Sequence, residues 1–130
     1  MYNLTVSDEQ TTTSTVLNQR LERLIELTRN LSAVQEPEAY LQSLLSAAVE
    51  LTGSETASIL EYDGEATFLR FRAVPWYHRE ALATISVPIN SSAAGWVVRK
   101  AAPLIITDAS QDERHFRDVD VVSNFKTRSL

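Results

Sequence analysis

The stretch VPINSSAAGWVVRKAAPLIITD, residues 87–108, decides how the rest of this 130-residue chain is interpreted. A strand at residues 85–89 ends near its proline, and Asn90, Ser91 or Ser92 can cap the helix that follows. The inner side of that helix should carry these apolar residues: Ala93, Trp96, Val97 and, at its margin, Val98. Residues 104–107 have no polar face, so they predict a strand buried on both sides.

Residues in the segment after this strand fit more than one role. Asp108 stands where the strand ends, and it can simply cap a turn with Ser110. Residues 112–120 show no clean period, and His115 and Phe116 within them fit a core or a pocket equally well. Amide donors at the helix start can hold an anion, but every helix has such an end, so this signal alone is weak.

Composition narrows the class of protein. Hydrophobic residues make up 44% and charged residues 22%, as in an ordinary soluble domain. A net charge of −5 argues against nucleic acid as a partner. The chain has no cysteine, no phosphate-loop glycine spacing and no apolar run that could span a membrane. We therefore expect a cytoplasmic domain with no nucleic-acid or membrane partner and no cofactor.

The N-terminal part predicts a lead-in and a helix. Residues 1–13 are polar and unpatterned, so we expect a disordered segment. Residues 14–34 are assigned to an N-terminal helix whose seam alternates spacings of four and three: Leu17, Leu21, Leu24, Thr28 and Leu31. This helix either lies on its own domain or is a signalling helix that pairs with a second copy.

A second helix and a hairpin should follow. Pro37 suits a first helical turn and Gly53 a helix end, with a broad apolar core face between them. Residues 57–62 and 65–74 then alternate as two strands around a two-residue turn at residues 63–64. In the return strand Arg70 and Arg72 share one face, which we expect to be solvated rather than a binding site.

An aromatic connector joins the hairpin to the strand at residues 85–89. Trp76 and Tyr77, followed by His-Arg-Glu, can form a short helix through Ala83. The two aromatic residues fit either a stacking or anion site or a plug at the edge of a core.

In order and spacing, these elements resemble a GAF domain, the small ligand-sensing module of signalling proteins. The resemblance rests on six segments of the sequence: 41–53, Ala57-Ser58-Ile59-Leu60, Val87-Pro88, Ala94-Gly95-Trp96-Val97-Val98, Pro103-Leu104-Ile105-Ile106-Thr107-Asp108 and Phe125-Lys126-Thr127-Arg128-Ser129-Leu130. The resemblance implies an α+β, GAF/PAS-like fold over residues 35–130: an antiparallel β-sheet with flanking helices, lacking the last strands and C-terminal helix of similar domains. We therefore expect the isolated chain to be marginally stable or to recruit a neighbour's strand.

The resemblance also implies a function. Similar domains bind a small molecule, such as a cyclic nucleotide or metabolite, and relay a signal within larger proteins such as sensor histidine kinases. Carried over by segment, the expected ligand-binding residues are Ser91, Ser92, Trp96, Asp108, His115, Phe116 and Phe125. A homodimer through the N-terminal helix is expected, and a ligand-free dimerisation scaffold is the alternative.

The resemblance does not imply an enzyme for this chain. Branches that act as free methionine sulfoxide reductases or attach bilins depend on cysteine, which is absent. His78 and His115 form no triad with any marked serine, so no catalysis is expected. Arg128 is expected to tie the sheet end to a carboxylate such as Asp108 or Asp118 rather than to touch a ligand.

Overall fold

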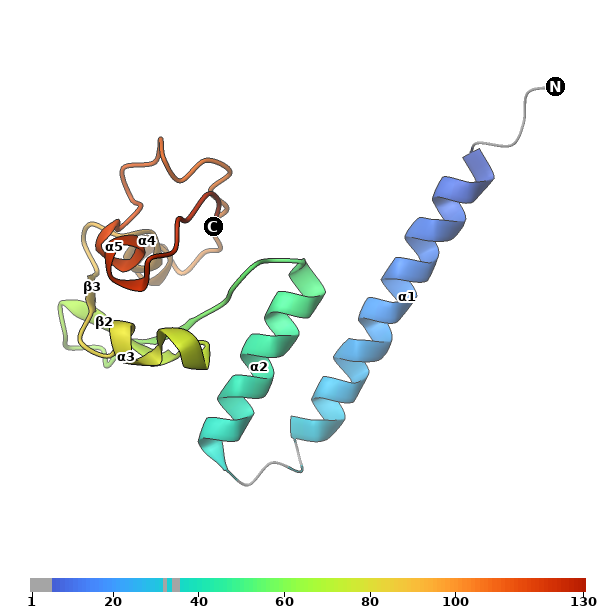
Figure 1. The fold of residues 1–130 in the computed structure, drawn as a ribbon, viewed down its shortest axis with the longest axis horizontal. Coiled ribbons are helices and arrows are strands. Elements are labelled where there is room, and N and C mark those ends of the chain that lie inside the picture. Colours follow the sequence, from blue (N-terminus) through green and yellow to red (C-terminus); the bar gives the residue numbers. More distant parts are fainter. Residues whose placement is uncertain (1–5, 32, 34–35) are drawn as a thin grey trace. The chain divides into compact units, whose positions relative to one another are not determined.

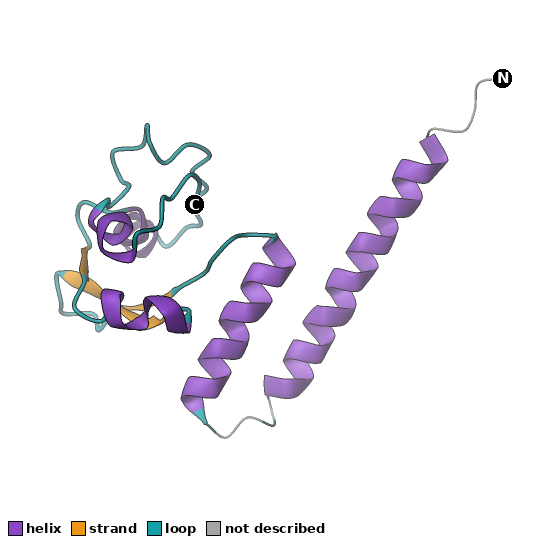
Figure 2. Cartoon of the chain, in the orientation of Figure 1, coloured by secondary structure: helices purple, strands orange, loops and turns teal. Residues whose placement is uncertain are grey.

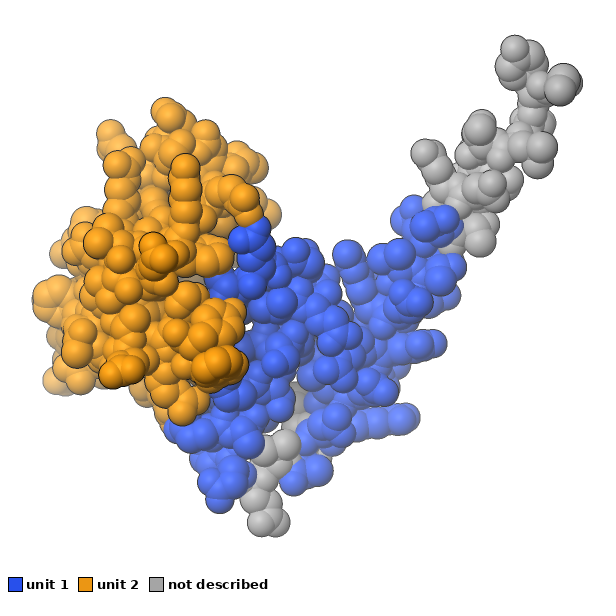
Figure 3. Space-filling view, in the orientation of Figure 1, with its two compact units in different colours: residues 1–57 blue, residues 58–130 orange. Residues whose placement is uncertain are grey.

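The computed structural model describes residues 6–31, 33 and 36–130, with side chains from Thr12 onward except that of Leu31. Helices and strands are distinguished in Figure 2. The chain divides into two compact units, residues 1–57 and 58–130 (Figure 3). The first contains two long helices, and the second contains a small sheet with short helices. The expected domain of residues 35–130 is therefore shared between the units.

Helix α1, Val6–Leu31, begins earlier than the sequence predicts (Figure 1). The expected disorder at residues 1–13 is wrong for residues 6–13, which are helical, while residues 1–5 lie outside the described residues. Once a helix is nucleated, each added residue gains a hydrogen bond, so the strong pattern downstream can extend through this polar segment. Residues 32 and 34 of the expected 14–34 segment also lie outside the described residues.

Helix α2, Pro37–Thr52, forms as predicted. Pro37 occupies the first turn, where its missing N–H leaves no hydrogen bond unmade. Gly53 ends the helix at φ 69°, a left-handed conformation, and its N–H donates to Val49 O at 2.9 Å. Within this unit α1 and α2 pack together, and Arg23 Nε donates to a Glu50 carboxylate oxygen at 2.8 Å.

The second unit is built on an antiparallel sheet with strands in the order β1-β2-β3. These strands are β1 (Ile59–Glu61), β2 (Phe68–Ala73) and β3 (Ser86–Pro88). The helical segments are η1 (Trp76–His78), α3 (Arg79–Leu82), α4 (Ala93–Lys100) and α5 (Asp118–Ser123). The predicted α+β fold with an antiparallel sheet is confirmed. Helix α5 was not predicted, because its acidic and apolar residues alternate without a helical period.

The two faces of β2 differ as the alternation predicts. Leu69 is only 2% exposed, whereas Phe68 is 47% exposed and both Arg70 and Arg72 are exposed. The buried face forms the core of this unit with residues from β3 and the segments that follow it. These core residues include Val87, Ile89, Ala94, Phe116 and Val119.

The turn between β1 and β2 is wider than the predicted two-residue turn. Strand pairing stops at Glu61. The Asp63 Oδ1 atom accepts hydrogen bonds from the backbone N–H groups of Glu65 and Ala66, at 3.1 and 2.7 Å. The Ala66 and Glu65 amides hold the pKa of Asp63 below its usual value. A carboxylate therefore organises this longer loop.

Helix α4 approaches the sheet through Gly95 rather than through the predicted Val97 and Val98. Gly95 is buried, whereas both valines are exposed. A Cβ atom at Gly95 would overlap the Ile89 carbonyl oxygen and lie 2.5 Å from its carbon. Because the backbone of α4 touches the backbone of the residue that follows β3, the inner side of α4 is centred on this glycine. The other predicted inner residues are only partly buried.

Residues 104–107 do not form the doubly buried strand that was predicted. The segment is extended, and Ile106 exchanges two backbone hydrogen bonds with Leu130, at 2.6 and 2.8 Å. Ile106 is buried, but Ile105 is 83% exposed. Successive side chains of an extended segment point to opposite faces, and here only one face is covered.

The aromatic connector forms the expected short helical segment but does not plug a core. Trp76 and Tyr77 are both exposed, with their ring centroids 5.7 Å apart in an edge-to-face arrangement. Tyr77 also lies edge-on to His78, with centroids 4.5 Å apart. The plug interpretation is therefore wrong for these two residues.

Candidate functional site

Ser92 begins α4, and its hydroxyl is committed to the fold. Its Oγ donates to Pro88 O at 2.5 Å and accepts from the Gly95 N–H at 2.9 Å. The side chain is buried, whereas Ser91 is exposed. Of the three possible caps, Ser92 is therefore the one used, and it holds the helix start.

Asp108 caps a turn, which was one of the two roles open from the sequence. Its Oδ1 accepts hydrogen bonds from the Ser110 backbone N–H at 2.9 Å and from the Ser110 hydroxyl at 2.6 Å. The Ser110 hydroxyl and amide both favour the ionised carboxylate, so they lower the pKa of Asp108. Asp108 is thus a fixed negative charge at neutral pH.

Arg114 lies over the ring of Trp96 and is held in place by Asp112. The guanidinium carbon is 5.5 Å from the ring centroid. Two parallel hydrogen bonds run from Arg114 to the Asp112 carboxylate, at 2.8 and 2.6 Å, and the Arg114 backbone N–H adds a third at 2.9 Å. These bonds lower the pKa of Asp112 to about 2. The result is a guanidinium fixed in both position and orientation.

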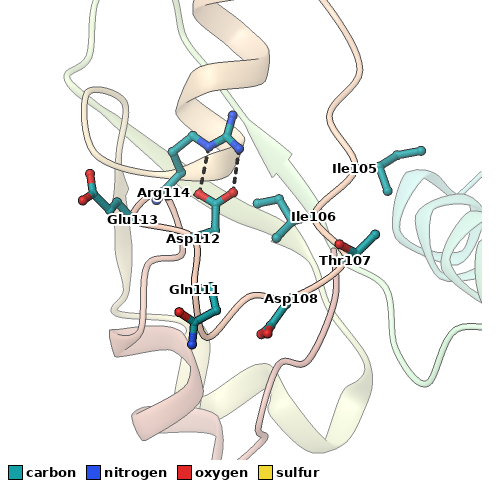
Figure 4. A pocket seen from close by; sticks show the side chains of 8 residues that line it. All are labelled: Ile105, Ile106, Thr107, Asp108, Gln111, Asp112, Glu113 and Arg114. Carbon is teal, nitrogen blue, oxygen red and sulfur yellow. Dashed lines mark hydrogen bonds and ion pairs between the residues drawn. The ribbon is translucent and has the colours of Figure 1, made fainter.

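An open hollow of about 560 Å³ lies beside this pair (Figure 4). It is formed by residues 105–108 and 111–114, and its lining carries three carboxylates against one guanidinium. Neutral polar groups and two isoleucines complete it. The lining residues are Ile105, Ile106, Thr107, Asp108, Gln111, Asp112, Glu113 and Arg114. This surface offers both donors and acceptors to a small polar molecule.

Asp120, in α5, ties two segments of the second unit together. One carboxylate oxygen accepts from the Thr127 backbone N–H at 2.9 Å and lies 3.1 Å from His115 Nε2. The other accepts from the Thr127 hydroxyl at 2.6 Å. The His115 side chain is only 7% exposed. We call His115, Asp120 and Thr127 the Asp120 clasp.

Phe116 and Phe125 lie outside the hollow. Phe116 packs against the sheet core around Leu69. The Phe125 ring lies edge-on to His78, with centroids 6.2 Å apart. Both aromatic residues therefore contact other parts of the second unit and do not line the open hollow.

Of the predicted site residues, Asp108 alone lines the hollow. Trp96 does not line it, but its ring packs against the guanidinium of Arg114, which does. The prediction missed Asp112 and Arg114. Their one signal in the sequence is an acidic and a basic residue two positions apart in a segment without a period. That spacing does not by itself predict a bidentate pair.

The second unit thus combines a small antiparallel sheet, short helices around it and an open hollow in the segments after β3. The family model of the GAF domain matches residues 34–123, and the chain belongs to the GAF family. GAF domains are sensory or regulatory modules that bind small molecules. Comparison with curated proteins gives no significant match. Among the described residues, no helix is both long and apolar enough to cross a membrane.

The Asp120 clasp predicts an acid-dependent loss of stability. Burial raises the pKa of Asp120, but the hydrogen bonds from Thr127 and His115 outweigh it and leave the pKa lowered. A carboxyl with a lowered folded pKa stabilises the fold above its unfolded pKa, near 3.9, and this stabilisation is lost as pH falls through the folded value. We therefore expect Asp120→Asn to lower stability by about 1–3 kcal/mol at pH 7 and to flatten its decline below about pH 4.

Thermal unfolding from pH 7 to about 3 measures both effects. Asp118→Asn, an exposed change in the same helix, is the matched control and should follow the wild type. Equal stability and equal slopes for wild type and Asp120→Asn would contradict a stabilising clasp.

Proposed function

We propose that this chain is a sensory GAF domain that binds a small molecule at the hollow of residues 105–114. It would relay the binding event within a larger signal-transduction protein, such as a sensor histidine kinase. The observation that supports this site is Arg114, held by Asp112 over Trp96 at the edge of the hollow. A preoriented polar group costs little additional ordering when a ligand binds.

The charge of the lining favours a neutral or cationic ligand. Asp108, Asp112 and Glu113 face one guanidinium, and Asp112 already pairs with it. A phosphate ester such as a cyclic nucleotide would meet net negative charge here. Polar amides, amines or nucleosides fit the lining better.

A ligand can transmit its effect only through different affinities for two arrangements of the domain. The hollow is connected to its surroundings on both sides. Ile106 pairs with Leu130, and Arg114 precedes His115 of the Asp120 clasp. We propose that a ligand stabilises the arrangement in which the hollow and the clasp are both formed. The role is binding rather than catalysis.

Trp96 provides the readout that tests the site. Trp76→Phe leaves Trp96 as the sole tryptophan. We expect at least one compound from a panel of amino acids, amines, nucleosides and cyclic nucleotides to change its emission saturably. Arg114→Gln should change that affinity at least about tenfold, because a neutral compound loses an oriented donor, whereas a cationic compound gains the freed Asp112 carboxylate.

Arg99→Gln, a change at an exposed arginine in α4, is the control. It should bind the compound as tightly as the Trp76→Phe chain in which it is made. A compound that binds Arg114→Gln and Arg99→Gln equally would place the ligand elsewhere.

A ligand-free scaffold is the second candidate function. The observation that favours it is the set of exposed leucines on α1, which lie outside the hollow. A folded chain that forms a stable oligomer yet binds nothing in the panel would support this role over ligand sensing.

A further inference from the structure

The guanidinium of Arg114 lies in a setting that would recognise a guanidinium from any source. It lies over the ring of Trp96, with its carbon 5.5 Å from the ring centroid. Its edge donates two parallel hydrogen bonds to Asp112, at 2.8 and 2.6 Å. A carboxylate beside an aromatic face matches the planar shape, the charge and the forked donors of this group together. A primary ammonium matches only the charge.

Arg114 is held at the surface of the second unit and not in its core. Its side chain is 37% exposed, and that of Asp112 is 17% exposed. Ion pairs in contact with water hold their partners weakly, because each charge is solvated when the pair opens. The Arg114 backbone N–H also donates to Asp112, at 2.9 Å, and this bond does not depend on the side chain. The guanidinium can therefore leave for solvent while the carboxylate keeps its orientation.

The rest of the hollow suits an alkylamine attached to such a guanidinium (Figure 4). Ile106 and the largely exposed Ile105 give it apolar walls for a methylene chain. Once Asp112 is paired with a guanidinium, the carboxylates of Asp108 and Glu113 remain in the lining to attract a second cation. A ligand carboxylate, such as that of free arginine, would meet net negative charge in the same place.

We infer that the hollow binds a guanidino alkylamine, with a guanidinium at one end and an amine at the other, and that Arg114 is the resident group it displaces. The ligand guanidinium takes the place of the Arg114 guanidinium against Asp112 and Trp96. The exchange leaves no charge unpaired in the site, because one guanidinium replaces another. Arg114 is tethered beside the site and competes at high effective concentration, so its removal should tighten ligand binding. This inference rests on the proposed binding at the hollow and specifies its cationic class.

Titration with agmatine, an alkylamine that ends in a guanidinium, is compared with cadaverine, an alkyl diamine of similar length. The two compounds carry the same charge, but only agmatine offers planar, forked donors. We expect agmatine to bind at least about tenfold more tightly than cadaverine, both to the wild-type chain and to Arg114→Gln. Arg114→Gln should also bind agmatine at least about tenfold more tightly than the wild type does.

Arg99→Gln is the control for charge, because it removes the same charge from an exposed position in α4 and should leave the affinity for agmatine unchanged. Equal affinities for agmatine and cadaverine would overturn the inference. An equal gain in Arg99→Gln and Arg114→Gln would do the same, since it would reflect general attraction of cations.

The Arg114 side chain reports its own displacement in the unsubstituted chain. Its Nε–H is hydrogen-bonded to Asp112 and should give a nitrogen-15 NMR signal that is assigned by its loss in Arg114→Gln. Saturation with agmatine should remove this signal or move it to the range of solvent-exposed arginines. The signal of Arg23 Nε–H, which is bonded to Glu50, should stay unchanged. Bound agmatine with an unchanged Arg114 signal would refute the displacement.

The outcomes separate this inference from the proposed function. Saturable binding of a neutral compound that Arg114→Gln weakens, without binding of agmatine, would overturn the guanidino inference and leave the hollow as a ligand site. A folded chain that binds neither agmatine nor any compound of the panel would contradict both.

Discussion

Replacement of Gly95 by alanine is expected to destabilise the second unit by roughly 3 kcal/mol or more, or to prevent its folding. The added Cβ would overlap the carbonyl of Ile89, whose own carbon and Cα lie 2.5 and 2.6 Å from the Cβ position. Backbone cannot swing aside as a flexible side chain can. Ile89 is also held by its N–H, which donates to Thr67 O at 3.0 Å. Denaturant unfolding followed by tryptophan fluorescence measures the loss.

Gly64→Ala is the informative comparison for this change. Gly64 has open space around it but a φ of 84°, so alanine there suffers backbone strain without a clash. We expect a cost of about 1–2 kcal/mol. If Gly95→Ala proves no more destabilising than Gly64→Ala, the close approach of α4 to the strand end is not as described.

Leu69→Ala is expected to cost about 3–4 kcal/mol of unfolding free energy, the second large effect. Leu69 is 2% exposed at the centre of the core formed with Val87 and Ile89. Truncation removes buried methyl groups and leaves a cavity. The cavity cannot close by a shift of β2, because β2 is paired with β1 on one side and β3 on the other. The same denaturant experiment gives the magnitude.

The neighbouring residue on β2 supplies the control. Phe68 is larger but points to the other face and is 47% exposed. Phe68→Ala should therefore cost less than about 1 kcal/mol despite the larger deletion. A Phe68→Ala loss equal to that of Leu69→Ala would mean that both faces of the sheet are buried and would contradict the description of β2.

The elements that could be predicted are those whose pattern is local. Alternation along β2 gave its two faces, and Pro37 and Gly53 gave the limits of α2. The prediction failed at Ile105, because a run of apolar residues does not tell how many of its faces are covered. It failed for the inner face of α4, because the backbone approach at Gly95, rather than the largest side chains, sets that face.

The candidate site was harder to predict because its contacts are made in the folded chain. Arg114 is eighteen positions from Trp96, and only the loop that brings them together reveals the pair. His115 was named for a pocket, yet Asp120 and Thr127 hold it in the clasp. Turn capping by Asp108, one of its two predicted roles, could be foreseen because its partner Ser110 is only two positions away.

Isothermal titration of the intact chain with the compound panel tests the central claim, that this GAF domain binds a small molecule at the hollow, most directly. We expect a saturable heat, with one site per chain, for at least one neutral or cationic compound. We also expect Arg114→Gln to change that affinity at least about tenfold, lowering it for a neutral compound and raising it for a cationic one, while Arg99→Gln leaves it unchanged. Silence across the whole panel with a folded wild-type chain, or equal affinity in Arg114→Gln, would contradict the claim.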